Sequence, residues 1–307
     1  MFKNLVVYRV TGEEGSPWSA RLDQVEAGLA KARFVPCAAS QPLSAGWVPP
    51  RAQGPAGEGP LVESVGGQWL MKLVVEQKIL PAAVVKRRTE ELARQAEAAT
   101  GRKPGKRQAK ELKEEAVLAL LPQAFTKQAS VNVWLDRKAA LLVIDASSAK
   151  RAEEAAALLV QALDGLALRL VQTTLSPAAA MTAWLAEGEA PAGFSVDREC
   201  ELKSADEMKS VVRYARHPLD TEEVRAHVLT GGKQPTRLVM TWKGRVSFVL
   251  TESLQIKKLS VDDGLFDAGN PRDGDEGFDA DAAIATGELR QLIPDLVAAL
   301  DGELTVA

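Results

Sequence analysis

The sequence contains few of the side chains on which metal and redox chemistry usually depend. Its 307 residues include two histidines and two cysteines. His217 and His227 stand ten residues apart with no cysteine pair nearby, so the ligand spacing of a zinc site is missing. Cys37 and Cys200 lie far apart in the chain and fit a reducing compartment. We expect neither a metal ion nor a cofactor.

Long apolar runs are also missing. No stretch approaches 18 uninterrupted apolar residues, so we expect no membrane-spanning helix and no membrane partner. Residues 2–10 alternate between apolar and polar and include Lys3 and Arg9, a pattern typical of a strand rather than of a signal peptide. With 46% hydrophobic and 26% charged residues, the composition is that of a soluble globular protein, which we place in the cytoplasm.

The motifs of common catalytic sites are absent as well. Neither histidine stands in the sequence context of a nucleophile triad. The segment 101–106 resembles a phosphate-binding loop, but it is one residue too short between its glycines, and Arg107 replaces the required Ser or Thr. Acidic residues are scattered and form no compact cluster among the predicted strands. The sequence therefore predicts that the protein is not an enzyme.

The charge is strongly segregated along the chain. Residues 86–113 contain ten Lys or Arg against four Glu, a net charge of +6, whereas the whole chain carries −3. Residues 262–281 carry eight acids against one Arg, and we interpret them as a solvated loop, because Phe278 stands where a calcium loop starting at Asp273 needs Gly. A cationic segment in an acidic protein indicates a polyanionic partner, of which nucleic acid is the commonest.

The basic segment has the apolar spacing of two helices separated by a break. Pro81 suits a first helical turn, residues 100–105 interrupt the pattern with Gly and Pro, and Pro122 ends it. The apolar positions are Val85, Leu92, Ala96 and Ala99 before the break, and Ala109, Leu112, Ala116 and Ala119 after it. This stripe is narrow enough to pair two helices but not to bury them in a core, so we predict a projecting antiparallel helical hairpin, a finger. Its most cationic part is the tip, which contains Arg102, Lys103, Lys106 and Arg107.

The remaining sequence alternates between strand and helix patterns without the regularity of βαβ units, which predicts an α+β fold with mixed sheets. Predicted strands cover residues 5–10, 69–75, 131–135, 139–144, 166–172, 211–215, 237–242, 245–250 and 254–261. Predicted helices cover 19–32, 148–163 with a Ser cap, 222–229 capped by Thr221, and a closing helix from Glu288, while 36–67 read as irregular. We divide the chain into an N-terminal domain (1–75 with 126–175), a basic helical finger (76–125) and a C-terminal domain (176–307).

Several stretches, in order along the chain, resemble the recombination-associated protein RdgC family of proteobacteria. They are Phe2-Lys3-Asn4-Leu5-Val6-Val7-Tyr8-Arg9, Gly46-Trp47-Val48-Pro49-Pro50, Lys78-Ile79-Leu80-Pro81, Leu120-Leu121-Pro122-Gln123-Ala124-Phe125, Trp134-Leu135-Asp136, Asp145-Ala146-Ser147-Ser148-Ala149-Lys150, Glu201-Leu202-Lys203-Ser204 and Thr286-Gly287-Glu288-Leu289. Each stretch is a weak signal, but together they span residues 2 to about 303 and are highly specific.

The resemblance implies a ring-shaped homodimer that encircles duplex DNA with little sequence preference, binds single-stranded DNA more weakly and is nucleoid-associated. It also implies that the protein limits the RecA recombinase by occupying the DNA on which RecA acts. The family's DNA-contact positions match Arg102 and Lys103 at the finger tip and Phe125 at the finger base. Where the family has a Lys-Gln pair near the opposite gate of the ring, this chain has Arg216-His217, a departure that keeps one positive charge.

Two other functions stay open at this point. The first is a non-DNA interaction protein that uses the finger as a dimerisation arm, its basic tip meeting the acidic residues 262–281 of a partner subunit. Salt-dependent binding to duplex DNA separates this alternative from a DNA-binding ring. The second is a metal-dependent nuclease, which magnesium-dependent loss of DNA would reveal.

Overall fold

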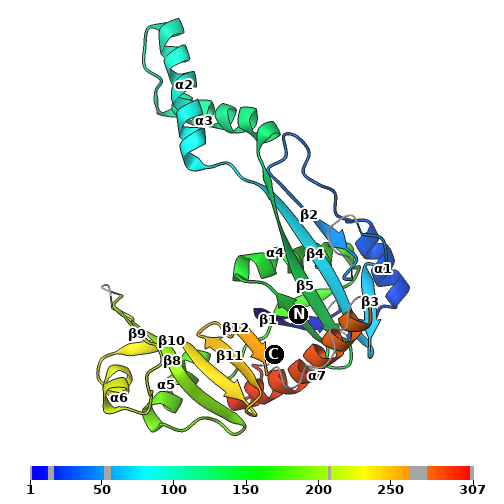
Figure 1. Cartoon of the computed structure of the whole chain (residues 1–307), viewed down its shortest axis with the longest axis vertical. Helices are drawn as coiled ribbons and strands as arrows, with labels where there is room; N and C mark the ends of the chain where they lie inside the picture. Colours follow the sequence, from blue (N-terminus) through cyan, green and yellow to red (C-terminus); the bar gives the residue numbers. More distant parts are fainter. Residues whose placement is uncertain (1, 13–16, 52–56, 207–208, 263–274, 305–307) are drawn as a thin grey trace.

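The structure is a computed structural model of the chain and describes residues 2–12, 17–51, 57–206, 209–262 and 275–304. Within these residues, seven α-helices and twelve strands form the predicted α+β fold (Figure 1). The helices are α1 (Leu22–Ala30), α2 (Ala82–Thr100), α3 (Lys106–Leu120), α4 (Ala149–Ala162), α5 (Pro177–Glu187), α6 (Glu222–Leu229) and α7 (Asp275–Ala299), with a 3-10 turn at Leu121–Gln123. The strands are β1 (Leu5–Thr11), β2 (Leu43–Val48), β3 (Val62–Val65), β4 (Gln68–Lys78), β5 (Thr126–Asp136), β6 (Leu141–Asp145), β7 (Ala167–Leu170), β8 (Phe194–Ser204), β9 (Val211–Tyr214), β10 (Lys233–Trp242), β11 (Val246–Thr251) and β12 (Ile256–Val261).

These strands belong to one antiparallel sheet, so the prediction of mixed sheets was wrong. Its order is β2-β4-β5-β6-β1-β12-β11-β10-β8-β9, with β3 beside β4 and β7 beside β1. The two predicted hairpins, β5–β6 and β10–β11, are confirmed. The N-terminal and C-terminal strands meet at β1 and β12, where Leu5 lies opposite Ile256. The sheet is therefore continuous from one half of the chain to the other.

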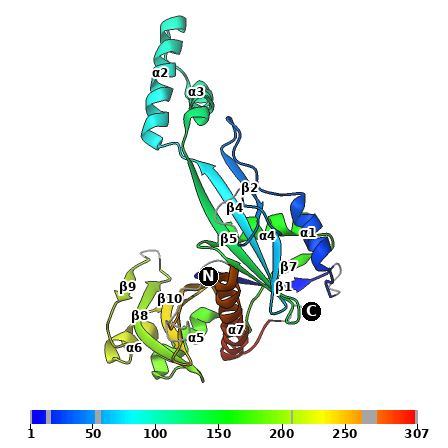
Figure 2. The same cartoon turned by 45° about the vertical axis from the view of Figure 1, so that its right-hand side comes forward.

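Alternating side chains along the strands feed two hydrophobic cores. On one face of the N-terminal strands, Val6 and Tyr8 pack with Leu29 of α1 and Leu159 of α4. On the opposite face, Leu5 and other N-terminal core residues join a second core, which extends into the C-terminal half. There α5, α6 and α7 cover one face of β8, β10 and β11 (Figure 2). The second core thus belongs to both halves of the chain.

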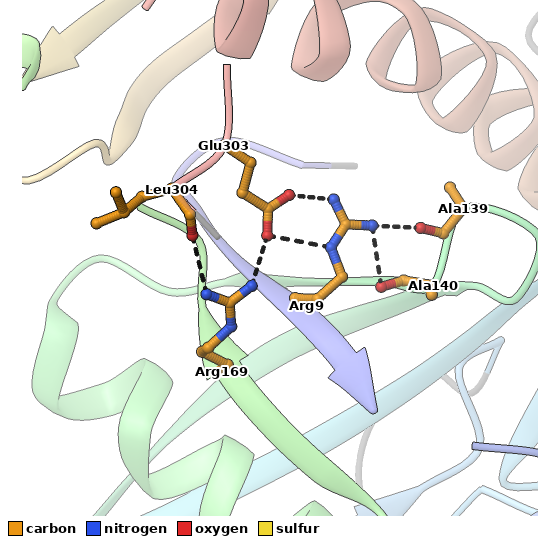
Figure 3. A network of polar contacts seen from close by, with 6 residues as sticks. All are labelled: Arg9, Ala139, Ala140, Arg169, Glu303 and Leu304. Atoms are coloured by element: carbon orange, nitrogen blue, oxygen red, sulfur yellow. Dashed lines mark hydrogen bonds and ion pairs between the residues drawn. The ribbon is translucent and has the colours of Figure 1, made fainter. Parts of the chain in front are cut away.

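Charged contacts near the C-terminus add a tie between the halves. The Glu303 carboxylate accepts hydrogen bonds from Arg9 of β1 and from Arg169 of β7, where the Arg169 Nη2–Oε1 distance is 3.1 Å (Figure 3). Arg169 also donates to the Leu304 carbonyl at 3.0 Å. On α7, Arg290 Nε lies 2.8 Å from the buried Asp136 carboxylate. These contacts cross the predicted boundary near residue 175, and the domain boundaries themselves stay a prediction.

The prediction that residues 36–67 are irregular was wrong. β2 and β3 both lie in this segment and pair with β4. Gly46 lets the backbone of Phe34 approach β2, since a Cβ at Gly46 would lie 2.4 Å from the Phe34 Cα. The many Gly and Pro residues thus mark the turns and close approaches around two strands, and they do not prevent strand formation.

Three other elements differ from the sequence prediction. α5 and β8 were not predicted, because α5 is rich in alanine and β8 carries many charged side chains. α7 begins at Asp275, well before the predicted Glu288, because Ala282 and Ala285 continue its buried stripe. The loop predicted at 262–281 therefore includes the first turns of α7, and residues 263–274 lie outside the described residues. The helix caps Ser148 and Thr221 are confirmed.

Among the described residues, no helix has both the length and the apolar character required to cross a membrane.

We predict that Glu303→Ala lowers the free energy of unfolding by about 1–2 kcal/mol, because it leaves Arg9 and Arg169 without their shared carboxylate. Thermal or urea denaturation measures the loss. Glu115→Ala is the matched control, since Glu115 is exposed on α3 and makes no ion pair within the described chain; it should change stability by less than about 0.5 kcal/mol. If both variants are as stable as the original protein, the contacts of Glu303 with Arg9 and Arg169 do not stabilise the fold.

Candidate nucleic-acid interface

A long ribbon formed by β4 and β5, with β2 at its edge, carries the basic helices away from the rest of the molecule. β4 and β5 pair from Trp69 opposite Leu135 to Lys78 opposite Thr126. We call residues 79–125, which follow β4 and precede β5, the helical arm. Figures 1 and 2 both show α2 and α3 beyond the far end of this ribbon. The long strand pair therefore sets where the arm stands.

Three hydrogen bonds to backbone carbonyls hold the base of the arm. The Ile79 N–H donates to the Phe125 carbonyl at 2.8 Å. The Lys78 ammonium donates to the carbonyls of Ala39 and Leu121 at 2.6 and 2.8 Å. Because the ends of the arm are tied to each other and to the segment before β2, the arm leaves the ribbon in a defined direction.

The predicted helices are present, but the predicted antiparallel seam holds only in part. Val85, Leu92 and Ala116 are buried between the helices, whereas Ala99 and Ala109 are exposed. In both views α3 crosses α2 instead of running back beside it (Figures 1 and 2). The reason is energetic. Burial of an alanine methyl group stabilises the contact by about 0.8 kcal/mol at most, which is too little to hold two charged helices side by side near the turn.

Charge is left unpaired at the turn between α2 and α3. Along the helices, ion pairs such as Lys86–Glu90 and Lys110–Glu114 neutralise most of the basic side chains, although Arg94 and Lys113 have no ion-pair partner among the described residues. By contrast, Arg102, Lys103 and Lys106 are exposed and have no ion-pair partner within the described residues. We call these three residues the cationic turn. Like charges in a short turn repel one another, so their concentration there does not serve the stability of the arm.

Two further features bear on the charge of the turn. Arg107, the fourth predicted tip residue, differs from the others because its Nε lies 3.1 Å from the Glu111 carboxylate. The N-terminus of α3 follows Gly105 without a side-chain cap and without an acidic residue in its first turn. Its free N–H groups add partial positive charge, which favours an anion at this position.

Phe125 lies at the base of the arm with its side chain in solvent. The residue is 86% exposed, so its side chain does not belong to a hydrophobic core. Ile79 and Leu118 are also exposed, at 47% and 58%. Only the Phe125 carbonyl has a structural role, through the bond from Ile79. The ring is therefore available for a contact with another molecule.

Arg216 and His217 lie in the turn after β9, in the C-terminal half. Arg216 adopts φ 56°, the left-handed region. The His217 N–H donates to the Arg198 carbonyl at 3.1 Å, and its ring lies 5.3 Å from that of Tyr214. Burial and the Glu223 carboxylate raise the pKa of Tyr214 to about 12. Within one chain, β9, which leads into this turn, and the helical arm lie at opposite ends of the molecule (Figure 1).

A second basic surface was missed by sequence reasoning. It is a groove of about 340 Å³ on the uncovered face of the C-terminal strands. Its basic lining residues are Arg213, Arg237, Lys257 and Lys258. These residues come from three strands, and no single segment carries enough of them to raise the local charge.

The described residues contain no group of three or more His, Cys, Asp or Glu side chains that could hold a metal ion. The two histidines both lie beside Tyr214, at ring distances of 5.3 and 6.3 Å, and not beside a cysteine pair.

The fold and these surfaces define an α+β protein with an exposed cationic arm. The chain matches the protein-family model described as "RdgC: Putative exonuclease, RdgC" over residues 1–303. It is 45% identical to the recombination-associated protein RdgC of Dechloromonas aromatica, covering 100% of this chain and 99% of that protein. It is 46% identical to the protein of the same name from Cupriavidus pinatubonensis, covering 98% of each, and 42% identical to that of Bordetella pertussis, covering 99% of each. The chain therefore belongs to the RdgC family of recombination-associated proteins.

We predict that Phe125→Ala leaves the stability within about 0.5 kcal/mol of the original, because the side chain is exposed. If the ring contacts nucleic acid, the same change lowers the affinity for DNA by about 1 kcal/mol or more, roughly fivefold. Fluorescence anisotropy measures the affinity. Leu118→Ala, an exposed apolar change on α3, is the control; an equal effect of both substitutions would show that Phe125 has no specific contact.

Proposed function

We propose that this protein binds duplex DNA through its phosphate backbone, encircles it as a ring-shaped homodimer and limits RecA-mediated recombination. The observation that carries the proposal is the cationic turn, where three basic side chains stand exposed and unpaired beside an uncapped helix N-terminus. Phosphate contacts of Lys and Arg release condensed counterions and supply affinity without reading base edges. Binding of this kind tolerates any sequence.

Duplex DNA fits these charges better than a single strand does. A duplex carries about twice the linear charge density of one strand, so a set of cationic side chains releases more counterions from it. We therefore propose that single-stranded DNA binds more weakly. Exposed Phe125 supplies an apolar contact at the arm base, and Arg216 and His217 supply a polar one at the other end of the chain.

The family and the shape of the chain together support the proposed ring and its target. The chain is curved, with the helical arm at one end and β9 with α6 at the other (Figure 1). Two such chains joined at both ends would enclose a space, with the arm at one junction and the Arg216-His217 turn at the other. A ring on DNA would block RecA by occupying its substrate, which places the protein with the nucleoid in the cytoplasm.

Two alternatives remain as test outcomes. A dimerisation arm without DNA binding would show no salt-dependent retention of duplex DNA. The matching family description names an exonuclease, so loss of labelled DNA on incubation with Mg²⁺ is the direct test of a nuclease. Intact DNA in that assay supports a non-catalytic binder, and shortened DNA contradicts it.

We predict that changing Arg102, Lys103 and Lys106 together to Ala weakens duplex binding while preserving the fold. Losing three phosphate contacts should flatten the slope of log affinity against log salt by about 2.7 units, at 0.9 per contact. RecA-driven strand exchange should then escape inhibition.

The charge-matched control changes Lys31, Lys138 and Lys150 together to Ala; all three are exposed and lie outside the arm. It lowers the net charge equally but should leave the slope within one contact of the original. If the two triple variants bind alike, the cationic turn has no special role and only net charge matters.

We predict a solution mass of twice 32.9 kDa by sedimentation equilibrium, since a ring needs a second copy. A monomer at micromolar concentration would contradict the ring, although it would leave DNA binding by the arm open.

A further inference from the structure

The C-terminal strands have one covered and one uncovered face. On the covered face, Leu202, Leu238 and Phe248 are buried in the core beneath α5, α6 and α7. On the other face, Val239 and Val249 are only partly covered and form the floor of the basic groove. No described element covers this groove, which therefore presents its polar side chains to solvent.

A part-buried acid organises the groove. The Glu201 side chain on β8 is 15% exposed and accepts hydrogen bonds from Arg213 Nε at 2.6 Å and from Thr236 Oγ1 at 2.8 Å. Arg237 Nε lies 3.9 Å from Glu201 Oε1, the oxygen that also accepts from Thr236. The strand register explains the arrangement, because Arg213 on β9 and Arg237 on β10 both lie opposite Glu201. Hydrogen bonding to Arg213 is the main cause that lowers the Glu201 pKa, so the carboxylate stays charged.

Both arginines meet Glu201 through Nε, which leaves their outer ends free. Within the described chain, the Nη groups of neither residue have another polar partner, and the two side chains are 73% and 58% exposed. A guanidinium presents these Nη groups as a planar fork that matches a phosphate. The Glu201 carboxylate fixes the inner edge of the Arg213 fork through a hydrogen bond and attracts Arg237 as an ion pair, so less rotamer freedom is lost when a ligand binds.

Two lysines extend the same surface. A register shift between β11 and β12 lies beside Lys257 and Lys258, and Lys258 has φ 52°. Both consecutive lysines line the groove as a result. Glu199 is the second acid there, so four basic residues face two acidic ones, of which Glu201 is already bound to arginine.

We propose that Glu201 is a positioning residue that holds Arg213 and Arg237 as a paired phosphate contact for the DNA backbone, with Lys257 and Lys258 continuing the track. The proposal rests on the duplex binding proposed above and adds a contact surface far from the cationic turn. An acid on a DNA-facing surface repels phosphates, so charge alone makes Glu201 unfavourable there. Its role must then be geometric. Removing this negative charge is therefore expected to weaken DNA binding, whereas charge repulsion alone would predict tighter binding.

The test compares Glu201→Gln with Glu199→Gln by fluorescence anisotropy on a duplex of random sequence. Each change removes one negative charge from the groove. We expect Glu201→Gln to weaken DNA binding by about tenfold, because the charge-assisted contact that orients the arginines is lost. Glu199→Gln should leave DNA binding unchanged or make it tighter. If Glu201→Gln binds as tightly as the original protein or more tightly, simple electrostatics governs the groove and the proposal is overturned.

A second variant covers the case in which Glu201→Gln does not fold. Arg213→Lys combined with Arg237→Lys keeps both charges and removes both forks, so the salt slope should stay constant while the affinity falls. Melting temperature and sedimentation check the fold. Unchanged DNA affinity with weaker self-association would assign the arginines to a protein contact and contradict the proposal.

Failure of this inference differs from failure of the proposed function. If the original protein does not retain duplex DNA, the proposed function fails. If it does, and the triple variant of the cationic turn is weakened while the groove variants are not, then only the paired contact at Glu201 fails.

Discussion

Pairing of β4 with β5 is the interaction on which the position of the helical arm depends. The two strands are hydrogen-bonded over residues 69–78 and 126–135, and their outer half has exposed side chains on β5. The inner half is anchored in the core, where Trp134 Nε1 donates to the buried Gln68 side chain at 2.8 Å. Two paired strands alone are marginally stable in water, so the outer half must be stabilised by this anchored half and by β2, which pairs with β4 from Leu43 opposite Gln77 to Val48 opposite Lys72. The arm can carry repelling charges because the sheet, not the arm, holds it in place.

The distribution of ion pairs separates structural charges from available ones. On the helices of the arm, acids spaced four residues from bases neutralise several of them, each pair contributing about 0.3–0.5 kcal/mol. In the cationic turn no acid plays this role within the described residues. In the basic groove, Glu201 contacts two arginines without covering their outer ends. Both surfaces leave cationic groups facing solvent. In the cationic turn no described acid lies nearby, and in the basic groove Glu201 contacts the arginines only on their inner, Nε side.

Local features of the sequence predicted local features of the structure. Apolar spacing and the Gly and Pro signals located α2 and α3, and Ser and Thr caps located the starts of α4 and α6. β8 was not predicted, because Asp197, Arg198 and Glu199 interrupt the alternation of apolar and polar residues along the strand. α5 was not predicted, because its many alanines give little difference in hydrophobicity between the two faces of the helix. Exposure of the cationic turn could be expected from the sequence alone. The groove could not, since it requires the register of β8, β9 and β10, which brings residues 201, 213 and 237 side by side.

The proposed function requires that phosphate contacts, and not base contacts, hold the protein on DNA. It is tested most directly by measuring the affinity for two duplexes of equal length and unrelated sequence over a series of salt concentrations. We expect both affinities to agree within a few-fold and to fall along parallel lines on a log–log plot. A preference of more than roughly a hundredfold for one duplex, or affinities that do not change with salt, would contradict it.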